Sequence, residues 1–250
     1  MRVCIGRTLL LCLLAAIWLN WPMPAGAQAE SHSGSRNYST PIGDFEGQSD
    51  IGSPKLEGSA FYDPIAKQYT LKSAGYNTTY TREEFRFVWK RMSGDVSIAA
   101  EITFPDQEGY DGRKAILAIR QGLEDDSKEA LVALYGSGIF ALSQRPSKGQ
   151  PRRDETYRVW GVPAHVRPDL RVILTPKRIA LEKRGDTFIL YVSIEGEPMH
   201  AFGSPLTLRM NQPLYVGIGF CSNMPEKVDT AIFSHVTVEN LPRGSTSANH

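Results

Sequence analysis

Cysteine is scarce in this chain of 250 residues, which contains three. Cys4 and Cys12 lie in an N-terminal segment that we expect to be removed, so the mature chain retains Cys221 alone. A single thiol cannot form an internal disulfide, and the fold must therefore depend on its hydrophobic core. Cys221 lies in an apolar stretch, which is more typical of a small buried side chain than of a reactive thiol.

An excess of charge of one sign is also missing, because Lys+Arg total 28 and Asp+Glu total 27. A nucleic-acid partner needs a basic face to contact phosphates, so this balance argues against one. Beyond the N-terminal segment there is no apolar run long enough to span a membrane.

The N-terminal segment has the pattern of a signal peptide. Arg2 and Arg7 precede the apolar run from Leu9 to Leu19, and the small residues Ala25-Gly26-Ala27 follow it. We expect cleavage before Gln28, which predicts a secreted or periplasmic protein.

Apolar residues with a helical period of 3.6 are absent from the rest of the chain. Short runs with a period of two take their place, as in residues 177–202, where two alternating runs flank the turn Arg184-Gly185-Asp186. About eleven such runs, separated by turn residues, predict an all-β sandwich or jelly roll of antiparallel sheets. We place this domain at residues 41–242 and expect the polar segments 28–40 and 243–250 to be flexible.

Four motifs in one order carry a family resemblance. They are Ser93-Gly94-Asp95-Val96, Arg113-Lys114-Ala115 through Ile119-Arg120-Gln121, Leu181-Glu182-Lys183-Arg184-Gly185-Asp186 and Tyr215-Val216-Gly217-Ile218-Gly219. The chain resembles the concanavalin A-like jelly-roll domains of secreted bacterial proteins that are often labelled biopolymer (TolR-type) transporters, and more distantly laminin-G-like and lectin-like sandwiches. The resemblance implies two curved antiparallel sheets, with the ligand on the concave one.

The chain departs from this family at two places. Relatives tend to carry Trp and then Asp where this chain has Thr79-Tyr80 and Glu83, and His where it has Tyr135. A fold resemblance of this kind implies no activity by itself.

Motifs for catalysis are missing as well. The sequence has neither a Gly-x-Ser-x-Gly elbow nor a His-Glu-x-x-His pair, and His165, His200 and His235 have no metal-ligand spacing. No strand carries two alternating carboxylates, the arrangement that could hold the pair of a retaining glycosidase, since Glu101 has no acidic neighbour on its face. We therefore expect no catalytic residue, no metal ion and no cofactor. The acidic run Glu124-Asp125-Asp126 could ligate calcium, but a solvated loop is the commoner explanation.

Alternation within the strands predicts a ligand face. If Val96 and Ala115 begin the core-facing residues of their strands, Glu101 and Arg120 lie on the opposite face and could either bind sugar hydroxyls or form an ordinary ion pair. Gly217 and Gly219 could leave room for a ligand above the sheet or accommodate its curvature. The candidate ligand-binding residues are Glu101, Arg120, Tyr135, Trp160 and Tyr215.

These observations predict an exported, lectin-like binding module for a glycan or an envelope polymer, without catalysis. Two alternatives stay open. One is a hydrolase or lyase acting on polysaccharide, and the other is a structural or assembly protein of the cell envelope. The sequence does not indicate an oligomeric state.

Overall fold

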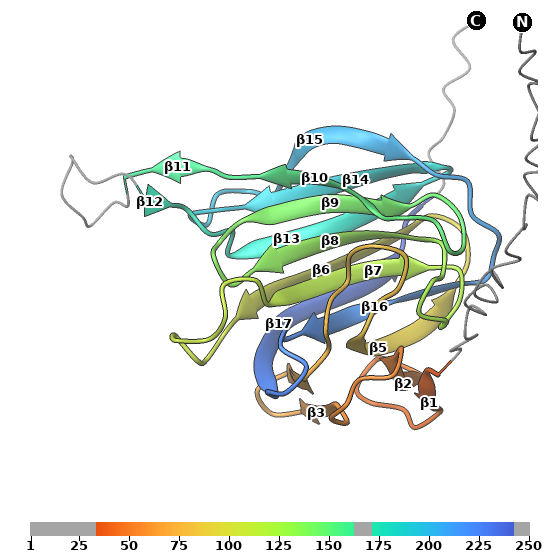
Figure 1. Ribbon diagram of the computed structural model, residues 1–250. Helices are drawn as coiled ribbons and strands as arrows, with labels where there is room; N and C mark the ends of the chain where they lie inside the picture. Colours follow the sequence, from red (N-terminus) through yellow and green to blue (C-terminus); the bar gives the residue numbers. More distant parts are fainter. Residues whose placement is uncertain (1–33, 163–171, 243–250) are drawn as a thin grey trace, which may run out of the picture. The chain divides into compact units, whose positions relative to one another are not determined.

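The structure is a computed structural model that describes residues 34–162 and 172–242 (Figure 1). The predicted signal peptide, the first residues after it and the tail 243–250 lie outside the described residues. The described residues contain strands and turns but no α-helix, so none of them forms a helix that could cross a membrane.

Two large antiparallel sheets make up the domain, as the alternating pattern predicts. The eight-stranded sheet has the order β1 (Arg36–Tyr38), β2 (Gly47–Ile51), β5 (Phe85–Met92), β16 (Leu214–Cys221), β7 (Lys114–Arg120), β8 (Glu129–Tyr135), β9 (Phe140–Arg145), β10 (Arg153–Tyr157).

The seven-stranded sheet has the order β15 (His200–Thr207), β14 (Thr187–Ser193), β13 (Arg178–Arg184), β6 (Val96–Thr103), β17 (Asp229–Asn240), β4 (Gln68–Ser73), β3 (Ser59–Asp63). A separate two-stranded ribbon pairs β11 (Trp160–Gly161) with β12 (Val172–Ile173). The late strands β16 and β17 insert between early strands of each sheet, which is the crossing connectivity of a jelly roll.

The main core lies between the two sheets, and every second residue of a strand points into it. Val96, Ile98 and Ala100 of β6 belong to the same cluster of buried residues as Val216 and Ile218 of the other sheet. The hairpin predicted at residues 177–202 is also confirmed, because β13 and β14 pair through a turn in which Gly185 has a positive φ of 55°. Glycine tolerates this conformation without a steric cost.

Ordered structure begins earlier than expected. β1 lies inside the segment 28–40 that the composition predicts to be flexible, and its three residues pair with β2. The side chains of this edge strand also have partners, since Ser49 donates a hydrogen bond to Asn37 Oδ1 at 2.7 Å. Pairing along an existing sheet edge orders a polar strand that has no apolar face of its own.

A second apolar cluster lies on the outer face of the eight-stranded sheet. Nine buried residues form it: Ile51, Phe85, Phe87, Trp89, Ile116, Ala118, Leu131, Ala133 and Cys221. An outer sheet face is normally open to water, so a further layer must cover this one.

Candidate functional site

The cover is the connection between β4 and β5, residues 74–84, which we call the crossing loop. Figure 1 shows it in orange in front of β7. The Cys221 thiol donates to Gly75 O at 3.2 Å, Lys114 Nζ to Asn77 Oδ1 at 2.8 Å, and Arg145 Nη1 to Tyr80 O at 2.7 Å. These contacts come from β16, β7 and β9 in turn, so the loop crosses most of the sheet.

Five buried charged residues, which we call the buried charge cluster, lie where the end of this loop meets the sheet. They are Glu83, Arg120, Glu129, Arg145 and Arg152. Arg120 Nη1 binds both Glu83, at 2.5 Å from Oε2, and Glu129. Arg145 Nη2 lies 3.2 Å from Glu83 Oε1. Register explains the arrangement, because Glu129 is the cross-strand partner of both Arg120 and Arg145.

The two carboxyl groups of the cluster have opposite protonation preferences. Burial alone would raise the pKa of Glu83, but the charges of Arg120, Arg145 and Arg152 and a hydrogen bond with Glu129 lower it to about 2. Burial raises the pKa of Glu129 well above its usual value, which the charge of Arg120 only partly offsets and the negative charge of Glu83 reinforces. Two carboxyl groups whose pKa values are displaced in opposite directions therefore share the guanidinium.

The solvent side of the crossing loop forms a pocket of about 320 Å³, which we call the tyrosine pocket. Its lining includes Tyr76 and Tyr80, which are 55% and 66% exposed. Four charged residues also line the pocket: Arg82, Glu83, Glu84 and Asp125. The side chain of Glu83 is itself fully buried. Arg82 Nη1 lies 3.7 Å from Asp125 Oδ2, and Glu84 Oε2 accepts a hydrogen bond from the Tyr76 amide at 3.2 Å.

Tyr80 is held in an unusual backbone conformation, with a φ of 67°. Its carbonyl accepts hydrogen bonds from Arg145 Nη1 at 2.7 Å and from the Arg152 amide at 3.0 Å. Two members of the buried charge cluster thus anchor the backbone while the ring projects outward. A left-handed conformation costs an L-residue about 1–2 kcal/mol, so these anchors must offset strain.

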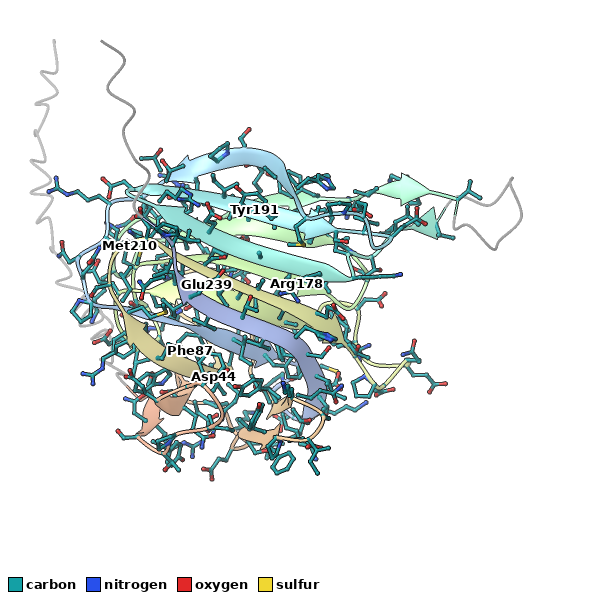
Figure 2. The ribbon with its side chains drawn as sticks, turned by 180° about the vertical axis from the view of Figure 1, so that it is seen from behind. Asp44, Phe87, Arg178, Tyr191, Met210 and Glu239 are labelled. Atoms are coloured by element: carbon teal, nitrogen blue, oxygen red, sulfur yellow. The ribbon has the colours of Figure 1, made fainter. Side chains whose placement is uncertain are left out.

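The expected pairing of Glu101 with Arg120 is wrong. β6 carries Glu101 in the seven-stranded sheet, where Glu101 Oε2 lies 3.1 Å from His235 Nδ1 and Arg178 is its cross-strand partner. Figure 2 labels Arg178 on that sheet, seen from behind. Arg120 belongs to the other sheet and is fully buried, so its guanidinium has no contact with solvent in this structure.

Three of the predicted ligand-binding residues do share a face. Arg120, Tyr135 and Tyr215 all lie on the outer face of the eight-stranded sheet. Lys114 Nζ lies 5.3 Å from the ring centre of Tyr135, and Tyr215 packs edge-on against Trp89 at 5.1 Å. These contacts fix both rings against neighbouring side chains rather than presenting them as a bare platform.

The other two expectations for this face are not met. Trp160 is 58% exposed, but it lies in β11, whose ribbon extends beyond the sheets in Figure 1. Gly217 and Gly219 leave no open space, because a Cβ at these positions would lie 2.9 Å from the Phe87 ring and 2.8 Å from the Phe85 ring.

Sequence reasoning missed the pair Glu83 and Glu129, the two tyrosines of the pocket and the crossing loop itself. A signal for part of the cluster was available, because the turn residues Gly136-Ser137-Gly138 join β8 and β9 as a hairpin, in which Glu129 lies across from Arg145. In the described ranges, no group of three or more His, Cys, Asp or Glu side chains could hold a metal ion.

Together, the two antiparallel sheets and their connectivity define an all-β jelly-roll sandwich. No protein-family model matches the chain, and no curated protein matches it either. Among solved structures it is similar to a functionally unknown protein from Saccharomyces cerevisiae, with 15% identity, 76% of this chain and 94% of that chain covered, and a TM-score of 0.50.

Two further structures are less similar. An alginate lyase from Klebsiella pneumoniae has 12% identity, covers 73% of this chain and 84% of its own, and has a TM-score of 0.43. The lectin UEA-II, solved with galactose, has 12% identity, covers 83% and 98%, and has a TM-score of 0.39. At these identities the comparisons show the fold alone.

Proposed function

We propose that the protein is an exported glycan-binding module and that the tyrosine pocket is its sugar-binding site. Aromatic rings stack on the apolar faces of sugars, and charged groups form strong hydrogen bonds with hydroxyls. Tyr76 and Tyr80 supply exposed rings, and Glu84 and Asp125 supply carboxylates in the same pocket. Its volume of about 320 Å³ suits one sugar unit of a longer chain.

The observation that carries this proposal is the conformation of Tyr80. A large aromatic residue occupies a left-handed backbone position, is anchored there by two buried arginines and exposes its ring. A glycine would fit this position without the steric strain. Strained residues that the surrounding structure holds in place are typical of ligand sites.

A binding function accounts for the carboxyl pair better than catalysis does. Glu83 belongs to the crossing loop and is part of the tyrosine-pocket lining, but the side chains of Glu83 and Glu129, which both contact Arg120, are fully buried in this conformation. A hydrolase or lyase would need this loop to move, and the movement would remove Glu83 from the pair because the loop carries it.

Two variants test the site: Tyr76→Ala and Tyr80→Gly, with Tyr110→Ala as the control for loss of an exposed tyrosine elsewhere. A glycan array first identifies a bound sugar for the full chain, and titration then compares affinities. Each pocket variant should weaken binding about tenfold, which corresponds to about 1.4 kcal/mol. Tyr80→Gly should meanwhile be at least as stable as the parent, because it relieves the backbone strain.

Unchanged affinity in both folded variants would overturn the assignment of this pocket. An array on which no glycan binds would overturn glycan binding itself and favour the structural or assembly role. Export is tested separately, since intact-mass analysis of the protein outside the cytoplasm should give a chain that starts at Gln28.

A further inference from the structure

A second pocket, of about 520 Å³, is lined by three basic side chains from three separate segments. We call it the basic pocket. Lys128 precedes β8, Lys148 follows β9, and Arg209 lies between β15 and β16. Lys148 Nζ is 3.6 Å from Asp126 Oδ1, whereas Lys128 and Arg209 have no ion-pair partner among the described residues. Glu124 is the one carboxylate in its lining, so the pocket carries net positive charge.

Hydrogen bonds within and between these segments hold the basic pocket in shape. The Gly122 amide donates to Ser127 Oγ at 2.8 Å, and the Gly149 amide donates to Asp126 O at 2.9 Å. From beneath, the buried Arg120 donates from Nη2 to Glu124 O at 2.7 Å. A site that is fixed before binding loses less entropy when the ligand arrives.

The segment 121–128 connects the two pockets. It contributes Asp125 to the tyrosine pocket, and Gln121, Glu124 and Lys128 to the basic pocket. Arg120 anchors this segment, and Arg145, which shares Glu83 with Arg120, anchors Tyr80 on the crossing loop. The buried charge cluster therefore positions walls of both pockets.

We propose that the bound glycan is acidic and that the basic pocket holds its carboxylate groups while the tyrosine pocket stacks a sugar ring. This inference rests on the proposed glycan-binding function. Guanidinium and ammonium groups form their strongest hydrogen bonds with anionic oxygens. The amide side chains of Gln121 and Asn211 also line the pocket and are suited to the hydroxyls beside such a carboxylate.

The test uses a matched pair of probes and the full chain. One probe is an oligogalacturonate, and the other is the same oligomer after its carboxyl groups have been reduced to alcohols. Calorimetric titration at low and at moderate salt should show that the acidic probe binds at least tenfold more tightly. Salt should weaken the binding of the acidic probe alone, because counterions screen its charges.

The variant Lys128→Gln/Arg209→Gln should weaken binding of the oligogalacturonate at least tenfold and leave binding of the reduced probe unchanged. The control Lys67→Gln/Lys72→Gln removes the same charge from exposed positions at β4 and should change neither affinity. The inference is overturned if the oligogalacturonate fails to bind, if both probes bind equally, or if the basic-pocket variant binds the acidic probe like the parent.

The two proposals can fail separately. If Tyr76→Ala and Tyr80→Gly weaken the reduced probe while Lys128→Gln/Arg209→Gln has no effect on either, the acidic-ligand inference alone is wrong. If the tyrosine variants change nothing while the basic-pocket variant weakens the acidic probe, the basic pocket stands and the tyrosine pocket is not the sugar site.

Discussion

Glu83 and Glu129 approach the same guanidinium nitrogen of Arg120, and both are buried, yet their chemistry differs. Glu83 also lies near Arg145 and Arg152, and its pKa is lowered to about 2. Burial is the main reason why the pKa of Glu129 is raised, and the nearby negative charge of Glu83 raises it further. The pKa values of the two groups are therefore displaced in opposite directions on folding.

This difference predicts unequal effects of the same substitution at the two positions. Glu83→Gln removes the carboxylate from three buried arginines and should cost about 3–5 kcal/mol of unfolding free energy, as breaking a buried ion pair does. Glu129→Gln removes a group whose ionised form burial already disfavours, so it should cost less. Urea unfolding at pH 7 compares the two variants, and equal losses would contradict the opposite directions of the two pKa shifts.

The free energy of unfolding should change with pH in the direction that these two pKa shifts predict. Because the pKa of Glu83 falls from 4.5 to about 2 on folding, its contribution is complete above 4.5 and is lost as the pH falls toward 2. Glu129 acts in the opposite direction, since its raised pKa makes folding less favourable as the pH rises above 4.5. Urea midpoints should fall between pH 4.5 and 2 for the parent and fall less steeply for Glu83→Gln.

For single residues, the sequence could predict on which face of a sheet a side chain lies, but not which other side chain it contacts. Alternation correctly placed Arg120, Tyr135 and Tyr215 on one outer face, because a period of two is a local property of each strand. It could not indicate that Glu101 belongs to the other sheet, since sheet assignment depends on crossing connections. Glu83 lies in a loop without periodicity, so nothing local located it beside Arg120.

At the scale of elements, β16 illustrates what alternation leaves undecided. Its alternation of residues gives a core face with Val216 and Ile218, and the structure buries both. The sequence did not indicate what covers Gly217 and Gly219 on the other face, where rings from the neighbouring strand β5 fill the space. That answer depends on the pairing of two strands distant in sequence.

Replacing Gly217 or Gly219 with alanine should lower the free energy of unfolding to different extents. A Cβ at Gly217 would lie 2.0 Å from the backbone oxygen of Val88, which cannot move aside without disturbing β5. Gly217→Ala should therefore cost about 1–3 kcal/mol, as overpacking does in a closely packed interior. At Gly219 the nearest atoms belong to the Phe85 ring, at 2.8 Å, so Gly219→Ala should cost less. Urea unfolding checks the order, and a larger loss for Gly219→Ala would contradict it.

For the whole molecule, the sequence predicted the jelly roll but not the third layer. Short alternating strands and their turns were enough to indicate two antiparallel sheets around one core. The crossing loop lacks such a pattern, and the contacts that hold it are polar and long-range, from Lys114, Arg145 and Cys221. Polar anchors of this kind give no hydrophobic signal that a sequence pattern could reveal.

The reactivity of the Cys221 thiol tests whether the crossing loop can open while the two sheets stay folded. Its thiol is fully buried against Gly75 at the start of the crossing loop, and burial raises its pKa to about 11. Because anchors on three strands hold the loop, we expect the thiol to become reactive only when the whole sandwich unfolds. The rate of alkylation by iodoacetamide, measured in a Cys4→Ser/Cys12→Ser chain, should therefore rise with urea as steeply as global unfolding does. A rate that is insensitive to urea would mean that the loop lifts away while the sheets stay folded, and that Glu129 then becomes open to solvent as Glu83 leaves with the loop.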